Sequence, residues 1–244
     1  MKPFFSFYGG KWRGAKYYPA PLHATIVEPF AGSAGYSVRH YERNVILCEK
    51  DPVIYGVWDY LLRATPAEIM RLPLLRAGDK ISDLPAQVPQ EARWLIGFLV
   101  NGAAAAPCNT PSSWMRRVLS GEHPQSASSF WGESRRARIA SQVEKIKHWK
   151  VYNRSWEDCP IPRGSATWFV DPPYQDMGKH YVYGSDGIDY EALGAWCRSR
   201  RGQVIACEGV GATWLPFRPL REIRSATCEG GKPRRFMEAI WTND

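Results

Sequence analysis

The chain of 244 residues contains 44% hydrophobic and 23% charged residues, the balance of a globular protein with a sizeable core rather than of a disordered chain. This length allows one large domain, or one domain that carries an inserted region. No apolar run approaches the ~18 residues that span a bilayer, and Asn101 and Gly102 end the longest one. A membrane-spanning chain is therefore excluded. Because residues 1–11 contain no secretion-signal core, we expect the protein in the cytoplasm.

The charge balance favours an anionic partner, and the cysteine pattern excludes several classes of site. Thirty-two Lys and Arg residues against 24 Asp and Glu residues give a net charge of +8, which suits a polyanion such as nucleic acid. The six cysteines form no C-x-x-C pair, and the five histidines are scattered. The sequence therefore indicates neither a metal site nor a disulfide framework, and we expect reduced, packed thiols.

Residues 1–64 have the pattern of a strand–helix–strand–helix unit. A β-branched strand over 23–27 leads into a small-residue turn over 31–35 and then a helix to about residue 43. A second strand over 44–48 precedes a helix that begins at Pro52 and runs through Leu62. Such alternation predicts parallel strands with right-handed crossovers, whose ligands lie beyond the carboxyl ends of the strands.

Residues 65–132 break this rhythm with seven prolines and a tract of four alanines, and we interpret them as an inserted region. Within it, residues 91–102 have a helical pattern. Residues 109–129 have an irregular or hairpin pattern that carries Arg116, Arg117 and His123.

Regular structure resumes after residue 132. The pattern predicts a helix over 133–149, a strand over 150–153 and a buried strand over 166–170. A helix over 189–201 and a strand over 203–207 follow. The chain is then predicted to form a hairpin from strands 220–228 and 235–242 across Gly230 and Gly231. Basic residues cluster on the first of these helices, at Arg135, Arg136 and Arg138, and beside the hairpin.

The first chemical motif is the turn Glu28-Pro-Phe-Ala-Gly-Ser-Ala-Gly35 together with Glu49, which follows Glu28 by 49 − 28 = 21 positions. A glycine turn after a strand lets a nucleoside-bearing cofactor approach the backbone, and an acid that ends the second strand binds ribose hydroxyls. Val38 stands where the dinucleotide fingerprint has Gly or Ala, and no Gly-Lys-Ser/Thr of a P-loop is present. A nucleoside without a pyrophosphate suits the turn better, and a plain strand-to-helix turn is the structural alternative.

The second motif is Asp171-Pro172-Pro173-Tyr174, at the end of the strand predicted over 166–170. Two successive prolines restrict the backbone and remove two N–H donors, so the carbonyl of Pro172 can act as a rigid acceptor. A carboxylate beside a carbonyl suits an exocyclic amino group, which offers two N–H donors. Tyr174 supplies a flat ring on which a base can stack.

These two motifs, with Phe7-Tyr-Gly-Gly-Lys11 before them, closely resemble the Dam-like DNA adenine-N6 methyltransferases, which use S-adenosylmethionine. The order of the elements is also similar, and the likeness extends over most of the chain except residues 65–132. The resemblance implies an α/β, Rossmann-like methyltransferase fold. It would have a central, mostly parallel sheet, helices on both faces, a C-terminal antiparallel hairpin and an inserted target-recognition region. The catalytic domain would comprise residues 1–64 and 133–244, and the recognition region residues 65–132.

The resemblance also implies roles for single residues. Phe7 and Lys11 would hold the methionine end of the cofactor, with Lys11 pairing with its carboxylate, above the turn that contains Phe30 and Gly32. Ser155 and Trp156 would lie near its adenine. The catalytic residues implied are Asp171, Pro172, Pro173 and Tyr174. The cofactor-binding residues are Phe7, Tyr8, Gly10, Lys11, Glu28, Pro29, Phe30, Gly32, Ser33, Glu49, Ser155, Trp156 and Asp171.

Double-stranded DNA is the partner implied, and a companion restriction nuclease is left open. Because residues 109–123 occupy the position of the family's recognition insertion, we expect them to enter the major groove. The DNA-binding residues would be Asn109, Ser112, Arg116 and Arg117. No recognition sequence follows from the chain.

Four other functions are alternatives. Cytosine-N4 or RNA-base methylation uses the same amino-group chemistry, and the N-terminal Gly-Gly-Lys element favours adenine in DNA over both. Cytosine-C5 methylation requires a nucleophilic cysteine, for which Cys108 is the weak candidate. A non-catalytic, cofactor-sensing DNA-binding module is the last alternative, against which the intact Asp171-Pro-Pro-Tyr174 motif argues.

Overall fold

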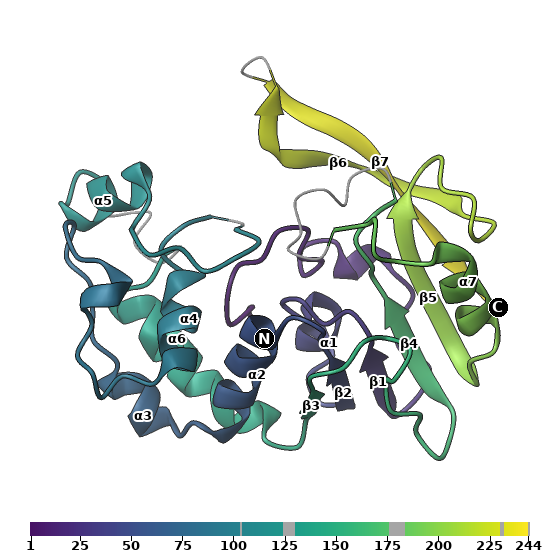
Figure 1. The fold of residues 1–244 in the computed structure, drawn as a ribbon, viewed down its shortest axis with the longest axis horizontal. Coiled ribbons are helices and arrows are strands. Elements are labelled where there is room, and N and C mark those ends of the chain that lie inside the picture. The colour runs from purple at the N-terminus through teal and green to yellow at the C-terminus, as the bar shows by residue number, and fades with distance from the viewer. Residues whose placement is uncertain (103, 124–129, 176–183, 230–231, 244) are drawn as a thin grey trace.

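The computed structural model describes residues 1–102, 104–123, 130–175, 184–229 and 232–243, with the backbone alone at 224–229 and 232–234 (Figure 1). Within these residues the chain forms one seven-stranded sheet of order β3-β2-β1-β4-β5-β7-β6. The first five strands in this order are parallel, and β7 runs antiparallel between β5 and β6. The strands are β1 (Thr25–Glu28), β2 (Asn44–Cys48), β3 (Lys150–Tyr152), β4 (Ala166–Val170), β5 (Gly202–Gly209), β6 (Arg218–Glu229) and β7 (Lys232–Thr242).

The helices begin at residues that suit helix N-termini. Asp51 accepts a hydrogen bond from the Val53 amide, and Thr65 forms a reciprocal capping box with Glu68. Ser112 and Asp189 cap two further helices. The α-helices are α1 (Gly35–Arg39), α2 (Pro52–Arg63), α3 (Pro66–Arg71), α4 (Gln90–Gly97), α5 (Ser113–Leu119), α6 (Glu133–Val143) and α7 (Tyr190–Arg198). Short 3₁₀ turns lie at Ala15–Tyr17, Ile81–Asp83 and Glu144–Ile146.

Both faces of the sheet are buried, because alternate residues of each central strand enter different hydrophobic clusters. Ile26 of β1 and Phe169 of β4 pack in one cluster with residues of α1, α2 and α6. Val27 and Trp168 pack in the other, together with residues of α7. Helices therefore cover both faces, and the structure is a mixed α/β fold compatible with a Rossmann-like arrangement, as the alternation of elements predicts.

Residues 65–132 do not form a separate core in their described part. Ile69, Leu95 and Met115 belong to the cluster that covers one face of the sheet. The Trp131 indole donates a hydrogen bond to the Pro73 carbonyl, 2.8 Å away, and so joins the two ends of the region. In Figure 1 this region, which contains α3, α4 and α5, lies at one side of the molecule, and the β6–β7 hairpin projects from the other.

Several predicted boundaries are wrong. The helix after the first turn ends at Arg39 rather than near residue 43, because the amide of His40 turns back to the Ser37 carbonyl. The helix predicted over 91–102 ends at Gly97, where Pro107 packs too closely to leave room for a Cβ. The irregular or hairpin structure predicted over 109–129 is wrong in its described part, since Ser112 starts the helix α5.

Other boundaries agree with the prediction. β2 and β4 span the predicted residues, and β6 pairs with β7 as an antiparallel hairpin. The predicted turn at Gly230 and Gly231 lies outside the described residues. None of the helices in the described part is long and apolar enough to cross a membrane.

Candidate active site

A cavity lies at the carboxyl ends of β1, β2 and β4, where the strand order reverses between β1 and β4. It encloses about 1060 Å³, counting the part that opens to solvent. Every residue predicted to bind a cofactor lines it: Phe7, Tyr8, Gly10, Lys11, Glu28, Pro29, Phe30, Gly32, Ser33, Glu49, Ser155, Trp156 and Asp171. Residues scattered over more than 160 positions of the sequence are thus brought together around one space.

The motif Asp171-Pro-Pro-Tyr174 lies at the same place, immediately after β4. Asp171 and Pro173 line the cavity, whereas Pro172 and Tyr174 are buried beside it. The Tyr190 hydroxyl at the start of α7 donates a hydrogen bond to the Pro173 carbonyl, 2.5 Å away. This contact holds the double-proline segment against the helix that follows it.

The turn after β1 adopts a backbone that few residues tolerate. Gly32 has φ of 45°, and Ala34 is a non-glycine residue with φ of 46°, in the left-handed region. The Gly32 carbonyl accepts a hydrogen bond from the Trp58 indole of α2, 2.8 Å away, which fixes the turn from below. A Cβ on Gly35 would come within 2.4 Å of the Trp12 amide nitrogen, so glycine is required where the N-terminal segment crosses the turn.

Glu49, which follows β2, is tied to the turn through its carboxylate. One oxygen accepts from the Gly32 amide at 2.9 Å, and the other accepts from the Asp51 amide at 3.0 Å. Burial raises the pKa of Glu49 to about 7, although these amide donors act in the opposite direction. Each oxygen has a second lone pair, so the carboxylate can still accept from hydroxyl groups in the cavity.

Glu28, the last residue of β1, forms the floor of the cavity. It is only 2% exposed and accepts a hydrogen bond from the Ser37 amide of α1 at 2.7 Å. Burial raises its pKa to about 8, so the side chain is mostly protonated at neutral pH. Its role here is to join β1 to α1 rather than to present a charge to a ligand.

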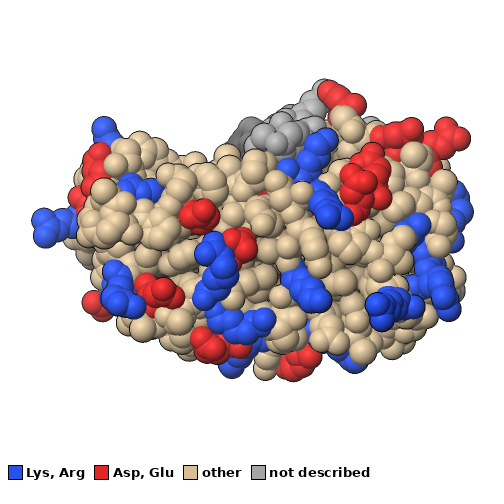
Figure 2. All heavy atoms as spheres, turned by 60° about the horizontal axis from the view of Figure 1, so that its bottom comes forward, with Lys and Arg blue, Asp and Glu red and all other residues tan. Residues whose placement is uncertain are grey.

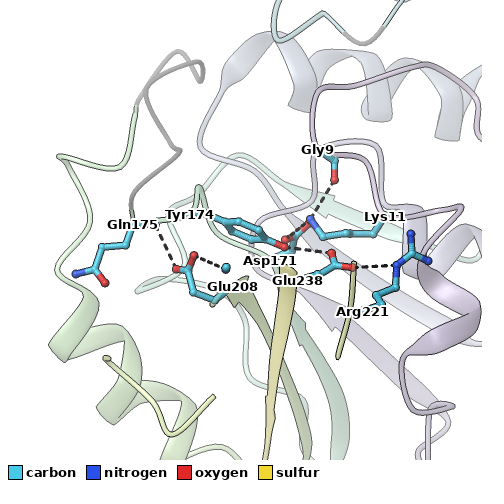
Figure 3. Close-up of polar contacts among 9 residues, drawn as sticks. Gly9, Lys11, Asp171, Tyr174, Gln175, Glu208, Arg221 and Glu238 are labelled. Carbon is cyan, nitrogen blue, oxygen red and sulfur yellow. Dashed lines mark hydrogen bonds and ion pairs between the residues drawn. The ribbon is translucent and has the colours of Figure 1, made fainter. Parts of the chain in front are cut away.

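Lys11 and Asp171 form a largely buried ion pair, with side chains 10% and 18% exposed (Figure 3). The Lys11 ammonium lies 2.7 and 2.8 Å from the two oxygens of Asp171 and donates to the Gly9 carbonyl at 3.0 Å. Burial raises the pKa of Asp171 to about 6, and the charge of Lys11 limits this rise. The resemblance predicts that Lys11 pairs with a cofactor carboxylate, and the structure pairs it with the acid of the motif.

Tyr174 is 8% exposed, and Lys11 lies over its ring, 4.8 Å from the centroid. The Tyr174 hydroxyl donates to Glu238 of β7 at 3.3 Å, and the other oxygen of Glu238 lies 3.7 Å from Arg221 of β6 (Figure 3). A chain of contacts therefore runs from the terminal hairpin to the motif. One side of the ring predicted to stack on a base faces Lys11 in this structure.

Sequence reasoning missed the buried acids that support the motif. Glu238 and Glu208 are each 1% exposed, on strands β7 and β5. Glu208 accepts hydrogen bonds from the Gln175 amide at 3.2 Å and from the Trp214 indole at 3.1 Å. A glutamate within an otherwise apolar strand pattern, as both have, is the signal that could have identified them.

The four residues predicted to contact DNA do not line the cavity and lie within residues 65–132. Asn109 accepts from the Ser82 amide at 2.8 Å, and Ser112 accepts from the Met115 amide at 3.1 Å as the cap of α5. Both side chains therefore stabilise the region itself. Arg116 and Arg117 are exposed on α5.

The two exposed arginines have local contacts of their own. Arg116 donates to the Pro111 carbonyl at 2.8 Å. Arg117 lies 4.9 Å from the centroid of the Trp114 ring, which in turn stacks on His123. Trp114 is 38% exposed, so this cation–aromatic group is presented at the surface.

Two arginines of the basic cluster on α6 donate hydrogen bonds to backbone carbonyls elsewhere in the chain. Arg135 is 8% exposed and donates to the Pro3 carbonyl, while Arg136 donates to the Leu72 carbonyl at 2.7 Å. These two side chains therefore hold the α6 helix against neighbouring segments of the chain. Among the described residues on the face in Figure 2, basic and acidic side chains are interspersed rather than gathered into one stripe.

Among the described residues, no group of three or more His, Cys, Asp or Glu side chains is arranged to hold a metal ion. No protein-family model matches the chain, and no curated protein sequence does. Among solved structures, a conserved hypothetical protein from Streptococcus pyogenes is 11% identical over 88% of this chain and 84% of that one, with a TM-score of 0.33. A likeness at this level assigns neither a family nor an activity.

Proposed function

We propose that this protein is a DNA methyltransferase that transfers a methyl group from S-adenosylmethionine to the N6 amino group of adenine. The observation that carries the proposal is the convergence of two motifs. The glycine turn with Glu49 and the acid of Asp171-Pro-Pro-Tyr174 line one cavity at the switch point of a mostly parallel sheet. The resemblance of both motifs to the Dam-like adenine methyltransferases supports the choice of cofactor and base.

The residues around the cavity fit a nucleoside cofactor without a pyrophosphate. Glu49 would accept hydrogen bonds from the ribose hydroxyls, and Ser155 and Trp156 would contact the adenine ring. Lys11 and Phe7 would hold the amino-acid end. A Cβ on Gly32 would lie 3.1 Å from the Phe7 ring, so glycine lets this ring pack closely against the turn. The bound cofactor would supply a methyl group already activated on a sulfonium sulfur.

The protein would contribute alignment of the adenine amino group with the methyl group, and electrostatic stabilisation of that amino group during the transfer. The amino group of adenine is a weak nucleophile because its lone pair is delocalised into the ring. Hydrogen bonds accepted by Asp171 and by the Pro172 carbonyl would favour a more tetrahedral nitrogen. Since the pKa of Asp171 is about 6, its carboxylate is mostly ionised above pH 7 and can accept from the amino group.

The ion pair with Lys11 affects how Asp171 would meet its substrate. Lys11 contacts both Asp171 and the ring of Tyr174, so its positive charge balances that of the carboxylate before a substrate binds. We expect the incoming amino group to share Asp171 with Lys11 and the target base to displace Lys11 from the face of Tyr174. The cost of unstacking the base, a few kcal/mol, would be offset by phosphate contacts elsewhere.

Two projections are available for duplex binding. The inserted region with α5 and the β6–β7 hairpin lie on different sides of the molecule in Figure 1. Arg116 and Arg117 are exposed on α5 and are the basic residues we assign to the DNA. Alanine substitution of both should weaken binding to DNA and change sequence preference, and unchanged affinity and preference would exclude α5 from the interface.

The experiment that tests the proposal is incubation of the protein with methyl-labelled S-adenosylmethionine and unmethylated genomic DNA, followed by mass spectrometry of the nucleosides. Labelled N6-methyladenine is the expected product. Labelled N4-methylcytosine would correct the base. Absence of label in DNA, with S-adenosylhomocysteine still bound, would refute the proposal in favour of an RNA substrate or a cofactor-sensing module.

A matched variant separates chemistry from binding. Asp171→Asn should lower methyl transfer by about 10²–10³-fold, because it removes one charged acceptor at the reacting amino group. The same variant should keep its affinity for S-adenosylhomocysteine within a few-fold. Loss of cofactor binding in this variant would instead assign Asp171 to the cofactor.

A further inference from the structure

Two buried cysteines lie in contact behind the cavity. Cys48 is the last residue of β2, and Cys159 follows the turn that carries Ser155 and Trp156. Their sulfur atoms are 2.7 Å apart, although the two residues are separated by 111 positions in the chain. This separation is shorter than an ordinary non-bonded contact, about 3.5–4.0 Å for carbon atoms, and longer than the roughly 2.05 Å of a disulfide.

Each cysteine is joined to a different wall of the cavity. The Cys48 carbonyl accepts a hydrogen bond from the Ala31 amide of the glycine turn, 3.0 Å away, and Glu49 follows it directly. The Cys159 amide donates to the Trp156 carbonyl, 3.3 Å away. A bond between the two sulfurs would therefore connect the ribose side of the cavity to its adenine side.

We propose that Cys48 and Cys159 are a covalent modification site, at which oxidation forms an intramolecular disulfide that clamps two walls of the cavity together. Closure requires the sulfurs to approach by well under 1 Å, from 2.7 Å to about 2.05 Å. Among the five cysteines whose side chains the structure describes, no other pair of thiols is in contact, so the contact distinguishes these two.

The reaction balances with a peroxide as the oxidant. Hydrogen peroxide converts one thiol to a sulfenic acid and releases water. The second thiol then attacks that sulfur, the S–S bond forms, and a second water leaves. Cys48 is 0% and Cys159 4% exposed, so oxidation must proceed through opening of the 155–159 turn. This turn carries the exposed residues Glu157 and Asp158, and a small oxidant suits it better than a bulky disulfide.

Burial has a kinetic consequence. The contact with the Cys48 thiol, and then burial, raise the pKa of Cys159, so little thiolate is present at neutral pH and the oxidation is slow in the closed state. Once formed, the disulfide is equally shielded from thiol reductants. The site therefore responds to sustained oxidation rather than to brief exposure.

The test is peptide mapping of the folded, full-length protein before and after treatment with hydrogen peroxide, with free thiols alkylated under denaturing conditions. The expected result is a cross-linked peptide pair containing Cys48 and Cys159, and its loss on reduction. Cys108, which is partly exposed, reports within the same sample that the oxidant was active. Because the buried pair reacts slowly, the treatment is continued well beyond complete oxidation of Cys108, and alkylation of both Cys48 and Cys159 at that point would overturn the proposal.

Variants and a ligand readout complete the design. Cys159→Ser should abolish the cross-link, while Cys197→Ser, at another buried cysteine, should leave it in place. If Cys159→Ser does not fold, the wild-type peptide map alone decides. The ligand readout rests on the proposed function: the oxidised wild-type protein should bind S-adenosylhomocysteine at least about threefold more tightly than the reduced protein, because the walls are pre-organised.

The two proposals fail in different ways. A cross-linked peptide in a protein that binds no S-adenosylhomocysteine in either redox state would refute the proposed function and leave the modification site standing. Binding of S-adenosylhomocysteine without any cross-link would refute the modification site and leave the proposed function standing. Equal affinity of the oxidised and reduced forms would overturn the clamping of the cavity.

Discussion

The raised pKa of Asp171 predicts that the proposed catalytic acid destabilises the fold, so its neutral replacement should stabilise it. The pKa of Asp171 rises from 3.8 to about 6 on folding, chiefly because the side chain is buried. A carboxyl whose pKa is higher in the folded protein favours unfolding wherever it is ionised. The penalty is absent below the unfolded pKa, grows between about pH 4 and 6, and is constant above that range.

The magnitude follows from the two pKa values. At 1.36 kcal/mol for each pKa unit, a rise of about two units corresponds to about 3 kcal/mol at pH 7.5 and to about half of that at pH 5.0. Asp171→Asn removes the charge but keeps an oxygen that can accept from Lys11. We therefore expect its free energy of unfolding to exceed that of the wild type by up to about 3 kcal/mol at pH 7.5.

The assay is urea unfolding of both proteins at pH 5.0 and pH 7.5, with the slope of each transition compared to confirm equal exposed surface. Asp158→Asn, at an exposed carboxylate on the nearby turn, is the control and should change stability by less than about 0.5 kcal/mol. A gain for Asp171→Asn that is larger at the higher pH supports the reasoning. Destabilisation, or an equal gain at both values, would refute it and show that the pair with Lys11 outweighs burial.

Three further predictions concern Glu49, the glycine turn and Glu238 of the hairpin. The affinity for S-adenosylhomocysteine should fall as the pH drops through about 7, where Glu49 takes up a proton, and calorimetry of Glu49→Gln should show a flat pH profile. Gly35→Ala should unfold at a lower temperature, by about 2–4 °C for each kcal/mol lost, because its methyl group would meet the Trp12 backbone at 2.4 Å. An unchanged melting temperature would contradict the tight crossing at this glycine. Glu238→Ala should lower kcat for methyl transfer more than it raises KM for the cofactor, since Tyr174 loses its acceptor, and Glu238→Gln should restore most of the rate. Equal kinetic effects of both substitutions would make the charge, rather than the hydrogen bond, responsible.

Local patterns account for the elements that surround the cavity. The β-branched strand before Glu28, the small-residue turn and the strand that ends at Cys48 were predictable, because each is set by side-chain alternation and turn chemistry over a few residues. The same holds for the strand that leads into Asp171. α5 was not predictable from its proline-rich surroundings, because its start depends on the cap at Ser112 and on the buried contacts of Met115.

The amino-acid sequence by itself determined the order of strands and helices outside residues 65–132, the position of the glycine turn and the double-proline motif, and therefore which residues could line a site. Only the tertiary structure decided that Lys11 pairs with Asp171, that Glu238 holds Tyr174, and that Cys48 meets Cys159. The physical reason is sequence separation: 160, 64 and 111 positions lie between these partners. No periodicity or propensity spans such distances, so the packing of the sheet, and not the local chain, sets the charges and contacts of the site.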